Sequence, residues 1–132
     1  MIITDRQEEL GRWMADRIGG TYTDGKTRYI GYTKNDQIVC GTSFSQYNEK
    51  SITVEMAVDN KRLNLEFLRF SFRYPFCQLG VNKLIAMVDS SNLTALKLDK
   101  HMGFIEEGRI KDAAKGGDLI LLTMTREQCK YI

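Results

Sequence analysis

The segment Asp59–Phe104 constrains the fold more than any other, because strand and helix patterns alternate within it. Lys83–Asp89 is short and apolar, as expected for a strand that is buried on both faces. Ser90-Ser91-Asn92 supplies N-cap side chains and Gly103 a helix end, which predicts a helix of about ten residues. Together with the preceding strand-like segment Ser51–Asp59, the order strand, helix, strand, helix implies one parallel step in the sheet with a right-handed crossover.

Two periodicities compete in Arg62–Gln78, the first part of this segment. Apolar and polar residues alternate over Leu68–Phe76, which favours a strand. A polar stripe at helical spacing favours a helix and consists of Arg62, Glu66, Arg69 and Arg73. The segment is long for a strand, and Pro75 would confine a strand to a sheet edge. We therefore predict a helix over Arg62–Gln78 that is kinked at Pro75.

The rest of the chain predicts one helix and a series of strands joined by short turns. Thr4–Ile18 has an amphipathic pattern, with Thr4 as its N-cap and Gly19-Gly20 at its end. The predicted strands are Thr27–Thr33, Gln37–Gln46, Ser51–Asp59, Phe104–Ile110 and Asp118–Thr125. The prediction is a single α+β domain spanning residues 1–132, with a mixed central sheet flanked by about three helices.

Composition narrows the class of protein. A net charge of +2 arises from interspersed signs, which does not indicate a nucleic-acid or membrane surface. The three cysteines are far apart and odd in number, which predicts free thiols in a reducing compartment. With one histidine and no CxxC motif, no local metal site is expected. The N-terminus has no export signal, so a cytoplasmic location is expected.

The C-terminal half carries a recognisable order of motifs. Asn92-x-x-Ala95-x-x-Leu98-x-x-x-x-Gly103-Phe104, followed by Glu107-Gly108, is similar to the C-terminal signature of the Gcn5-related N-acetyltransferases (GNAT). The preceding Tyr74–Lys83 resembles the helix-to-strand junction of the same family. That junction is most similar to a compact subgroup often carried by tailed bacteriophages, which would place the protein in a host cytoplasm. The resemblance covers Asp59 to the C-terminus.

The resemblance implies a mixed sheet, antiparallel except for one parallel pair, Ser51–Asp59 and Lys83–Asp89, that splays apart to hold acetyl-CoA. The pantetheine arm would pair with the backbone along Met56–Val58, and the pyrophosphate would lie at the N-terminus of the helix near Arg62. The cofactor contacts implied in this way are Met56, Ala57, Val58, Lys61, Arg62, Leu63, Asn64 and Asn92. Independently, Lys61 and Arg62 are cations at a predicted helix N-terminus, where a bound phosphate would offset their unfavourable interaction with the helix dipole.

Two departures from the family pattern leave other functions open. The family's usual glycine-containing phosphate loop corresponds to Asp59–Asn64, which contains no glycine. A tyrosine that many members carry after the leucine equivalent to Leu98 is replaced by Asp99, which is expected to be ionised near neutral pH. The alternatives are a GNAT-like binding protein without catalysis and an acyl-CoA sensor.

Acetyl transfer from a thioester to an amine requires positioning and removal of an amine proton. Glu55, on the strand beside the expected thioester, is the candidate base, and Tyr47 and Asp59 are weaker candidates for contacting the amine. The acceptor, a small molecule or a protein, stays open. Exposed aromatic residues on Arg62–Gln78 also leave a homodimer open.

Overall fold

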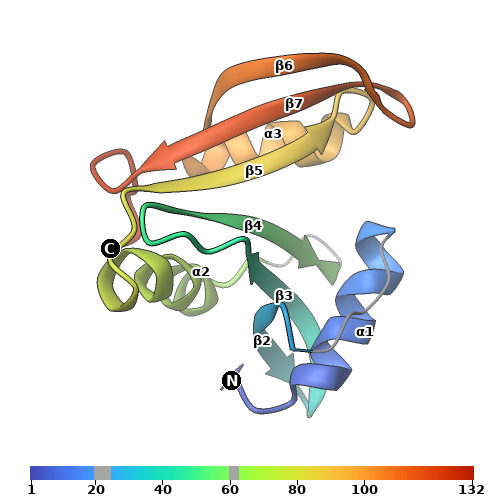
Figure 1. Cartoon of the computed structure of the whole chain (residues 1–132). Coiled ribbons are helices and arrows are strands. Elements are labelled where there is room, and N and C mark those ends of the chain that lie inside the picture. Colours follow the sequence, from blue (N-terminus) through green and yellow to red (C-terminus); the bar gives the residue numbers. More distant parts are fainter. Residues whose placement is uncertain (20–24, 60–62) are drawn as a thin grey trace.

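The computed structural model describes residues 1–19, 25–59 and 63–132. Its helices in these ranges are α1 (Gln7–Ile18), α2 (Leu65–Arg73), which continues into a π-helical turn η2 (Tyr74–Gln78), and α3 (Leu93–Met102). Its strands are β1 (Ile2–Ile3), β2 (Arg28–Lys34), β3 (Gln37–Ser45), β4 (Ser51–Val58), β5 (Lys83–Asp89), β6 (Ile105–Ala114) and β7 (Gly117–Thr125). Within the described residues these seven strands form one sheet in the order β1-β2-β3-β4-β5-β7-β6 (Figure 1).

The sheet is antiparallel except where β4 lies beside β5. This parallel pair is hydrogen-bonded only over Ser51–Thr53 of β4 and Lys83–Ile85 of β5, and the two strands then diverge (Figure 1). Past this point each strand stays paired with its other neighbour: β4 pairs with β3 over Thr53–Val58, and β5 pairs with β7 over its whole length. The predicted α+β fold, a mixed sheet with one splayed parallel pair, is therefore confirmed.

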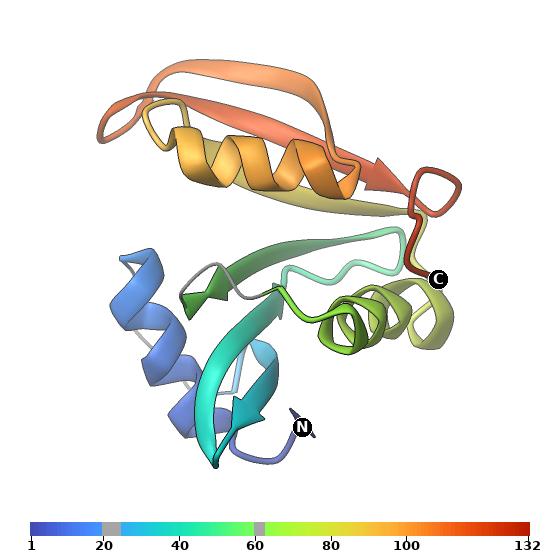
Figure 2. The same ribbon diagram turned by 180° about the vertical axis from the view of Figure 1, so that it is seen from behind.

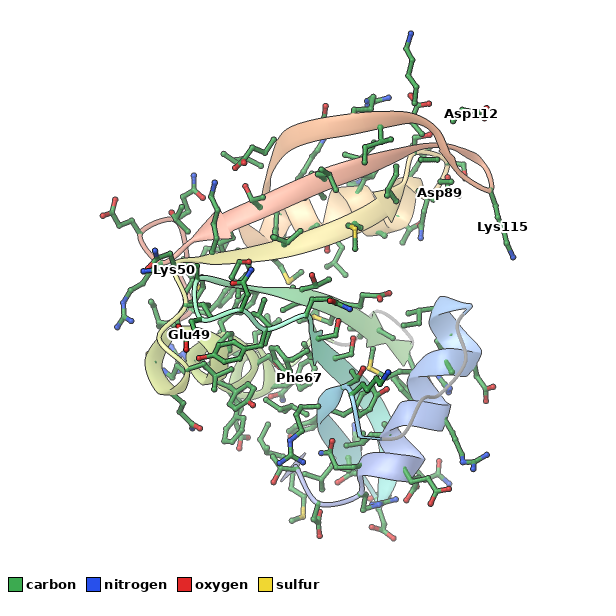
Figure 3. The ribbon with its side chains drawn as sticks, in the orientation of Figure 1. Glu49, Lys50, Phe67, Asp89, Asp112 and Lys115 are labelled. Carbon is green, nitrogen blue, oxygen red and sulfur yellow. The ribbon has the colours of Figure 1, made fainter. Side chains whose placement is uncertain are left out.

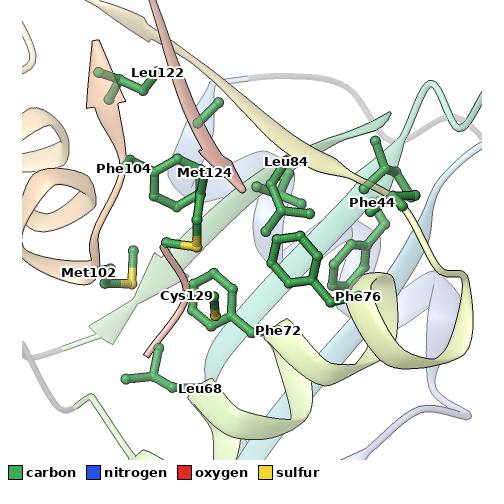
Figure 4. Close-up of a cluster of buried hydrophobic side chains, with 14 of the residues drawn as sticks. Phe44, Leu68, Phe72, Phe76, Leu84, Met102, Phe104, Leu122, Met124 and Cys129 are labelled. Atoms are coloured by element: carbon green, nitrogen blue, oxygen red, sulfur yellow. The ribbon is translucent and has the colours of Figure 1, made fainter. Parts of the chain in front are cut away.

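Helices cover both faces of the sheet. On one face, Leu10 and Met14 of α1 pack in a small cluster with Tyr29, Ile38 and Ala57. On the other face, α2 and α3 lie in front of the strands in Figure 2 and contribute to the main core. Figure 4 shows the side chains of this core, where Phe72 of α2 lies 6.4 Å from Phe104, centroid to centroid. The main core includes side chains from β2–β4 on one side of the gap between β4 and β5 and from β5 and β7 on the other, so it holds the two parts of the sheet together.

The first helix begins at Gln7, so the predicted N-cap on Thr4 is wrong. The side chain of Gln7 instead donates to the carbonyl oxygen of Tyr29 at 2.7 Å and accepts from its amide at 2.9 Å. The residues before it form the short strand β1, which the sequence did not predict and which pairs with β2. Gly19 ends the helix in a left-handed conformation (φ 77°), as predicted.

The second helix begins at Leu65 rather than at Arg62. Asn64 is its N-cap, with the side-chain oxygen accepting from the amide of Phe67 at 3.0 Å. At the other end, Pro75 has no N–H to donate to Ser71, and the chain adopts a π-helical turn in which the amide of Leu79 donates to the Tyr74 carbonyl at 3.1 Å. The disturbance predicted at Pro75 therefore takes the form of a wider turn.

Candidate active site

A cleft of about 1120 Å³ opens where β4 and β5 diverge. Its walls are the ends of β4 and β5 on two sides and the inner face of α3 on a third, with α2 and the end of α1 contributing residues at its margins. At the closed end, the carbonyl of Lys50 accepts from the amides of Asn82 and Lys83 at 2.8 and 3.2 Å, next to Glu49 (Figure 3). The cleft therefore exists because β4 and β5 are hydrogen-bonded to each other at the start of both strands and not beyond Thr53 and Ile85.

The free edge of β4 forms one wall of the cleft. Pairing with β5 stops at Thr53, so the inner edge of the following residues faces the cleft instead of another strand. Met56, Ala57 and Val58, the residues predicted to pair with a pantetheine arm, all line it. An exposed strand edge presents alternating N–H and C=O groups to which an extended chain can hydrogen-bond. The structure thus brings these three predicted residues together in a suitable arrangement.

The N-terminus of α2 lies at the edge of the cleft, where Leu63 is one of the lining residues. The Asn64 side chain satisfies the amide of Phe67, and the amides of Leu65 and Glu66 precede it without intrahelical acceptors. Lys61 and Arg62, the cations predicted to contact phosphate, lie outside the described residues.

Asn92 combines a structural role with a position in the cleft. Its side-chain oxygen accepts from the amide of Ala95 at 3.1 Å and so caps α3, and the residue also lines the cleft. The cap uses only the oxygen, which leaves the side-chain NH₂ group as a hydrogen-bond donor at the cleft wall. The predicted cap is confirmed, and a contact with a ligand is compatible with it.

Two carboxylates line the cleft from different elements, Glu55 on β4 and Asp99 on α3. The Glu55 side chain is accessible to solvent, yet the surrounding walls partly desolvate its carboxylate and raise its pKa. Asp99 is half-buried, and desolvation raises its pKa from 3.8 to about 6. The ordinary aspartate pKa assumed from the sequence therefore does not apply to Asp99.

The sequence contained a signal for this second carboxylate. Asp99 is four residues after Ala95 and three before Met102, both on the inner stripe of an amphipathic helix. The positions three and four residues away from Asp99 hold no cation, so its carboxylate is expected to be desolvated without compensation.

The two weaker candidates for contacting an amine occupy different surroundings. Asp59 lines the cleft, but its carboxylate accepts two hydrogen bonds from the Arg17 guanidinium, at 2.8 and 2.9 Å, and this contact holds the pKa of Asp59 below its usual value. Arg17 in turn lies 3.8 Å from the centroid of the Trp13 ring, so the pair joins the end of α1 to the end of β4. Tyr47 is half-exposed in the connection before β4, at the closed end, and is not among the described residues that line the cleft.

Metal ligands do not gather in the parts of the chain that the structure describes. No group of three or more His, Cys, Asp or Glu side chains is placed there to hold an ion. The three cysteines, Cys40, Cys77 and Cys129, are free. Across the same ranges, no helix has the length and apolar composition required to span a bilayer.

The fold matches that of several acetyltransferase structures. No family model and no curated protein matches the sequence. The N-acetyltransferase PseH of Campylobacter jejuni, solved in complex with acetyl coenzyme A, superposes with a TM-score of 0.60 at 24% identity over 78% of this chain and 70% of that one. A chimera of the Vibrio cholerae spermidine N-acetyltransferase SpeG with hSSAT gives a TM-score of 0.74 at 14% identity over 96% of both chains. A SpeG point mutant gives 0.74 at 14% over 100% of this chain and 95% of that one.

The chain therefore has the fold of these N-acetyltransferases. The likeness agrees with the GNAT resemblance of the sequence, and at these identities it concerns the fold.

Proposed function

We propose that the protein is an N-acetyltransferase of the GNAT type that transfers acetyl from acetyl-CoA to a primary amine by direct attack in a ternary complex. The observation that carries this proposal is the parallel strand pair that parts after Thr53 and exposes the edge of β4 in a cleft. Acetyl coenzyme A bound to a neighbour of the same fold, PseH, supports the choice of co-substrate. We keep membership of the phage-borne subgroup and a host-cytoplasm location as predictions from the sequence.

The cofactor would be held at three places. Its pantetheine arm hydrogen-bonds to the backbone along Met56–Val58, and the NH₂ group of Asn92 donates to the same arm. Its pyrophosphate lies at the N-terminus of α2 beside Leu63 and Asn64, where amides without intrahelical acceptors favour an anion. Lys61 and Arg62 contribute positive charge to that contact.

Glu55 would remove the proton from the attacking amine, directly or through one water molecule. An alkyl ammonium has a pKa of about 10.4, so a base is required before its nitrogen can attack the thioester carbonyl. Desolvation raises the pKa of Glu55, which makes this carboxylate a stronger base than an ordinary glutamate. A backbone N–H on the free edge of β4 would stabilise the developing negative charge on the carbonyl oxygen.

Binding is tested first, by calorimetric titration of acetyl-CoA into the purified protein. The Arg62→Ala variant should bind about tenfold more weakly, because one charge-assisted hydrogen bond is lost. Arg12→Ala is the matched control, since Arg12 is exposed on α1, pairs with Glu8 and is not a lining residue of the cleft. No heat with wild type up to millimolar ligand would contradict the proposal and favour a binding protein without catalysis.

Turnover is tested by chromatographic measurement of coenzyme A released in the presence of candidate amines. Spermidine belongs in this panel because neighbours of the same fold are named as spermidine N-acetyltransferases, and a lysine peptide represents protein acceptors. Glu55→Gln should lower kcat about 100-fold, whereas the exposed Glu127→Gln should not. Binding of acetyl-CoA without acetylation of any amine would instead identify an acyl-CoA sensor.

Homodimerisation stays a prediction that concerns the outer face of α2. A shallow hollow of about 510 Å³ lies there, lined in part by Leu65, Phe70 and Tyr74, and Leu65 and Phe70 are 52% and 38% exposed. Light scattering across a concentration series, repeated with Phe70→Ser, would show whether this face joins two copies.

A further inference from the structure

One face of the sheet is left uncovered over β5, β7 and β6 within the described residues. Helix α1 packs on this face against β2, β3 and β4, and α3 lies on the opposite face, behind β5 and β7 in Figure 1. Partner residues in neighbouring antiparallel strands point to the same side of a sheet. The register therefore places an apolar surface on the uncovered side, the outer face, which consists of Ile85, Met87, Ile105, Ile110, Leu119 and Leu121. Met87, Ile105 and Ile110 are 46%, 50% and 49% exposed.

The outer face reaches the cleft at Met87, which belongs to both. On β4, Ala57 packs against α1, and Glu55 is two residues earlier, so both side chains point to the side of the sheet that carries the outer face. Helices α2 and α3, whose N-termini are proposed to hold the cofactor, lie on the other side (Figure 2). An amine that approaches Glu55 from the side opposite the cofactor therefore passes Met87 and the outer face.

The cleft is acidic on the side of the outer face. Glu55 of β4 and Asp89 of β5 both line it and point to this side. The carboxylate of Asp89, labelled in Figure 3, accepts hydrogen bonds from the loop that follows it and from the β6–β7 turn, and these bonds lower its pKa and keep it ionised. Lys97 and Lys100, which also line the cleft, are on α3 on the other side. A cationic amine beside an apolar segment is therefore complementary to this side of the cleft.

The size of the outer face suits a short extended segment rather than a second copy of the chain. Three strands about 4.8 Å apart, followed over about five residues of 3.3 Å each, give roughly 200 Å². A stable interface between two proteins buries about 800 Å² on each partner. Polar groups bound the outer face at one end, where Lys83 pairs with Glu107, and at the other, where Asp89 lies beside Leu119 in the register. The width of the three strands corresponds to about four extended residues.

We propose that the outer face binds the polypeptide that carries the acceptor amine, an inference that rests on the proposed function. The acceptor is then a lysine side chain or an N-terminal amine with apolar neighbours, rather than a free polyamine. Its amine enters the cleft beside Glu55, and its apolar neighbours cross the outer face over Met87 and Leu121 towards Gly108, which adds no side chain opposite Leu121. The acetyl group passes from sulfur to the amine nitrogen, the amine proton passes to Glu55, and the thiolate takes a proton from solvent, which gives an amide and a thiol.

Matched peptides test the acceptor class through coenzyme A release. One pair has a blocked N-terminus and a single lysine flanked by leucines or by serines, and a second pair has no lysine and a free N-terminus before the same flanks. The leucine peptide of at least one pair should have a kcat/KM about tenfold above its serine counterpart, because only leucine side chains bury apolar surface on the outer face. The pair that reacts shows which kind of amine is used. Equal kcat/KM for leucine and serine peptides in both pairs would overturn the proposal.

Variants of the outer face give a second readout. Ile105→Thr and Ile110→Thr keep a β-branched side chain on β6, and each should raise the KM for the leucine peptide about fivefold, because each loses apolar contact area. Leu93→Ser is the matched control, since Leu93 is 73% exposed on α3 and is not among the lining residues of the cleft, and it should leave that KM unchanged. Urea unfolding followed by Trp13 fluorescence checks that each variant is folded. An unchanged KM in both folded β6 variants would overturn the proposal.

Other occupants of the outer face and failure of the proposed function give different results. Spermidine acetylated with a higher kcat/KM than every peptide would overturn the acceptor class and leave acetyl transfer intact. Light scattering across a concentration series should show no association through the outer face, and a dimer that Ile110→Thr dissociates would show that a second copy occupies it, which overturns the proposal. Binding of acetyl-CoA without acetylation of any peptide would also overturn it, whereas failure of wild type to bind acetyl-CoA would overturn the proposed function as well.

Discussion

Replacing Asp99 by asparagine should stabilise the folded protein at alkaline pH. The pKa of Asp99 is higher in the folded state than in the unfolded chain, so the native state binds the proton more tightly. Wild-type stability gains fully from this difference below about pH 4, and the gain is lost as pH rises through about 6. Above that pH a carboxylate is held without a partner in the cleft wall, a cost that asparagine does not have.

The size of the effect follows from the displacement of the pKa. A rise from 3.8 to about 6 is about two pKa units, and each unit corresponds to 1.36 kcal/mol, which sets an upper value of about 3 kcal/mol. Because Asp99 is half-buried and its carboxylate keeps some contact with water, we expect about 2 kcal/mol. This is a large share of the stability of a domain of this size.

Urea unfolding followed by the fluorescence of Trp13, the single tryptophan, measures the difference. The free energy of unfolding of Asp99→Asn relative to wild type should rise by about 2 kcal/mol between pH 4 and pH 8, with unchanged m-values. Asp16→Asn, a replacement of an exposed aspartate on α1, controls for the loss of one negative charge. A difference between Asp99→Asn and wild type that is the same at both pH values would refute the desolvation argument.

Three further replacements test other contacts. The hydroxyls of Thr42 on β3 and Ser71 on α2, two buried residues that line the cleft, lie 3.0 Å apart. Ser71→Ala should lower the free energy of unfolding in urea by about 2 kcal/mol, because the buried hydroxyl of Thr42 then has no hydrogen-bond partner. Thr42→Val should lower it by only about 1 kcal/mol, because the hydroxyl of Ser71 can instead donate to a backbone carbonyl one helical turn earlier. Gly31→Ala should cost about 1–3 kcal/mol, since its Cβ would collide with Leu10, and an unchanged unfolding midpoint would contradict that packing. Asn92→Asp should keep the α3 cap and the stability of the fold but weaken acetyl-CoA binding in calorimetry. Asn92→Ala should weaken binding and also lower the free energy of unfolding by about 1 kcal/mol, because the cap is lost. Equal affinity for Asn92→Asp and wild type would exclude the contact from the NH₂ group.

Local signals in the sequence predicted the elements that depend on local contacts. Lys83–Asp89 is β5 as predicted, and α3 runs from its predicted cap on Asn92 to Gly103. A cap is a hydrogen bond between residues three apart, and an apolar stripe reflects the period of the helix, so both can be read without the rest of the fold. The mixed sheet with its splayed pair was reached through family resemblance and strand order together.

Contacts between residues far apart in the sequence decided where α1 begins, where the cleft opens and how strongly Asp99 is desolvated. The start of α1 depends on Gln7 binding the backbone of Tyr29, 22 residues away, which no local pattern indicates. The cleft exists because β4 and β5 are held by their outer neighbours, β3 and β7, and no single strand encodes that competition. The raised pKa of Asp99 likewise arises from atoms that only the packed molecule brings around it. Sequence by itself determined the type and the approximate position of every helix and strand except β1. Tertiary structure settled desolvation and the choice among hydrogen-bonding partners, because both depend on groups far apart in the chain.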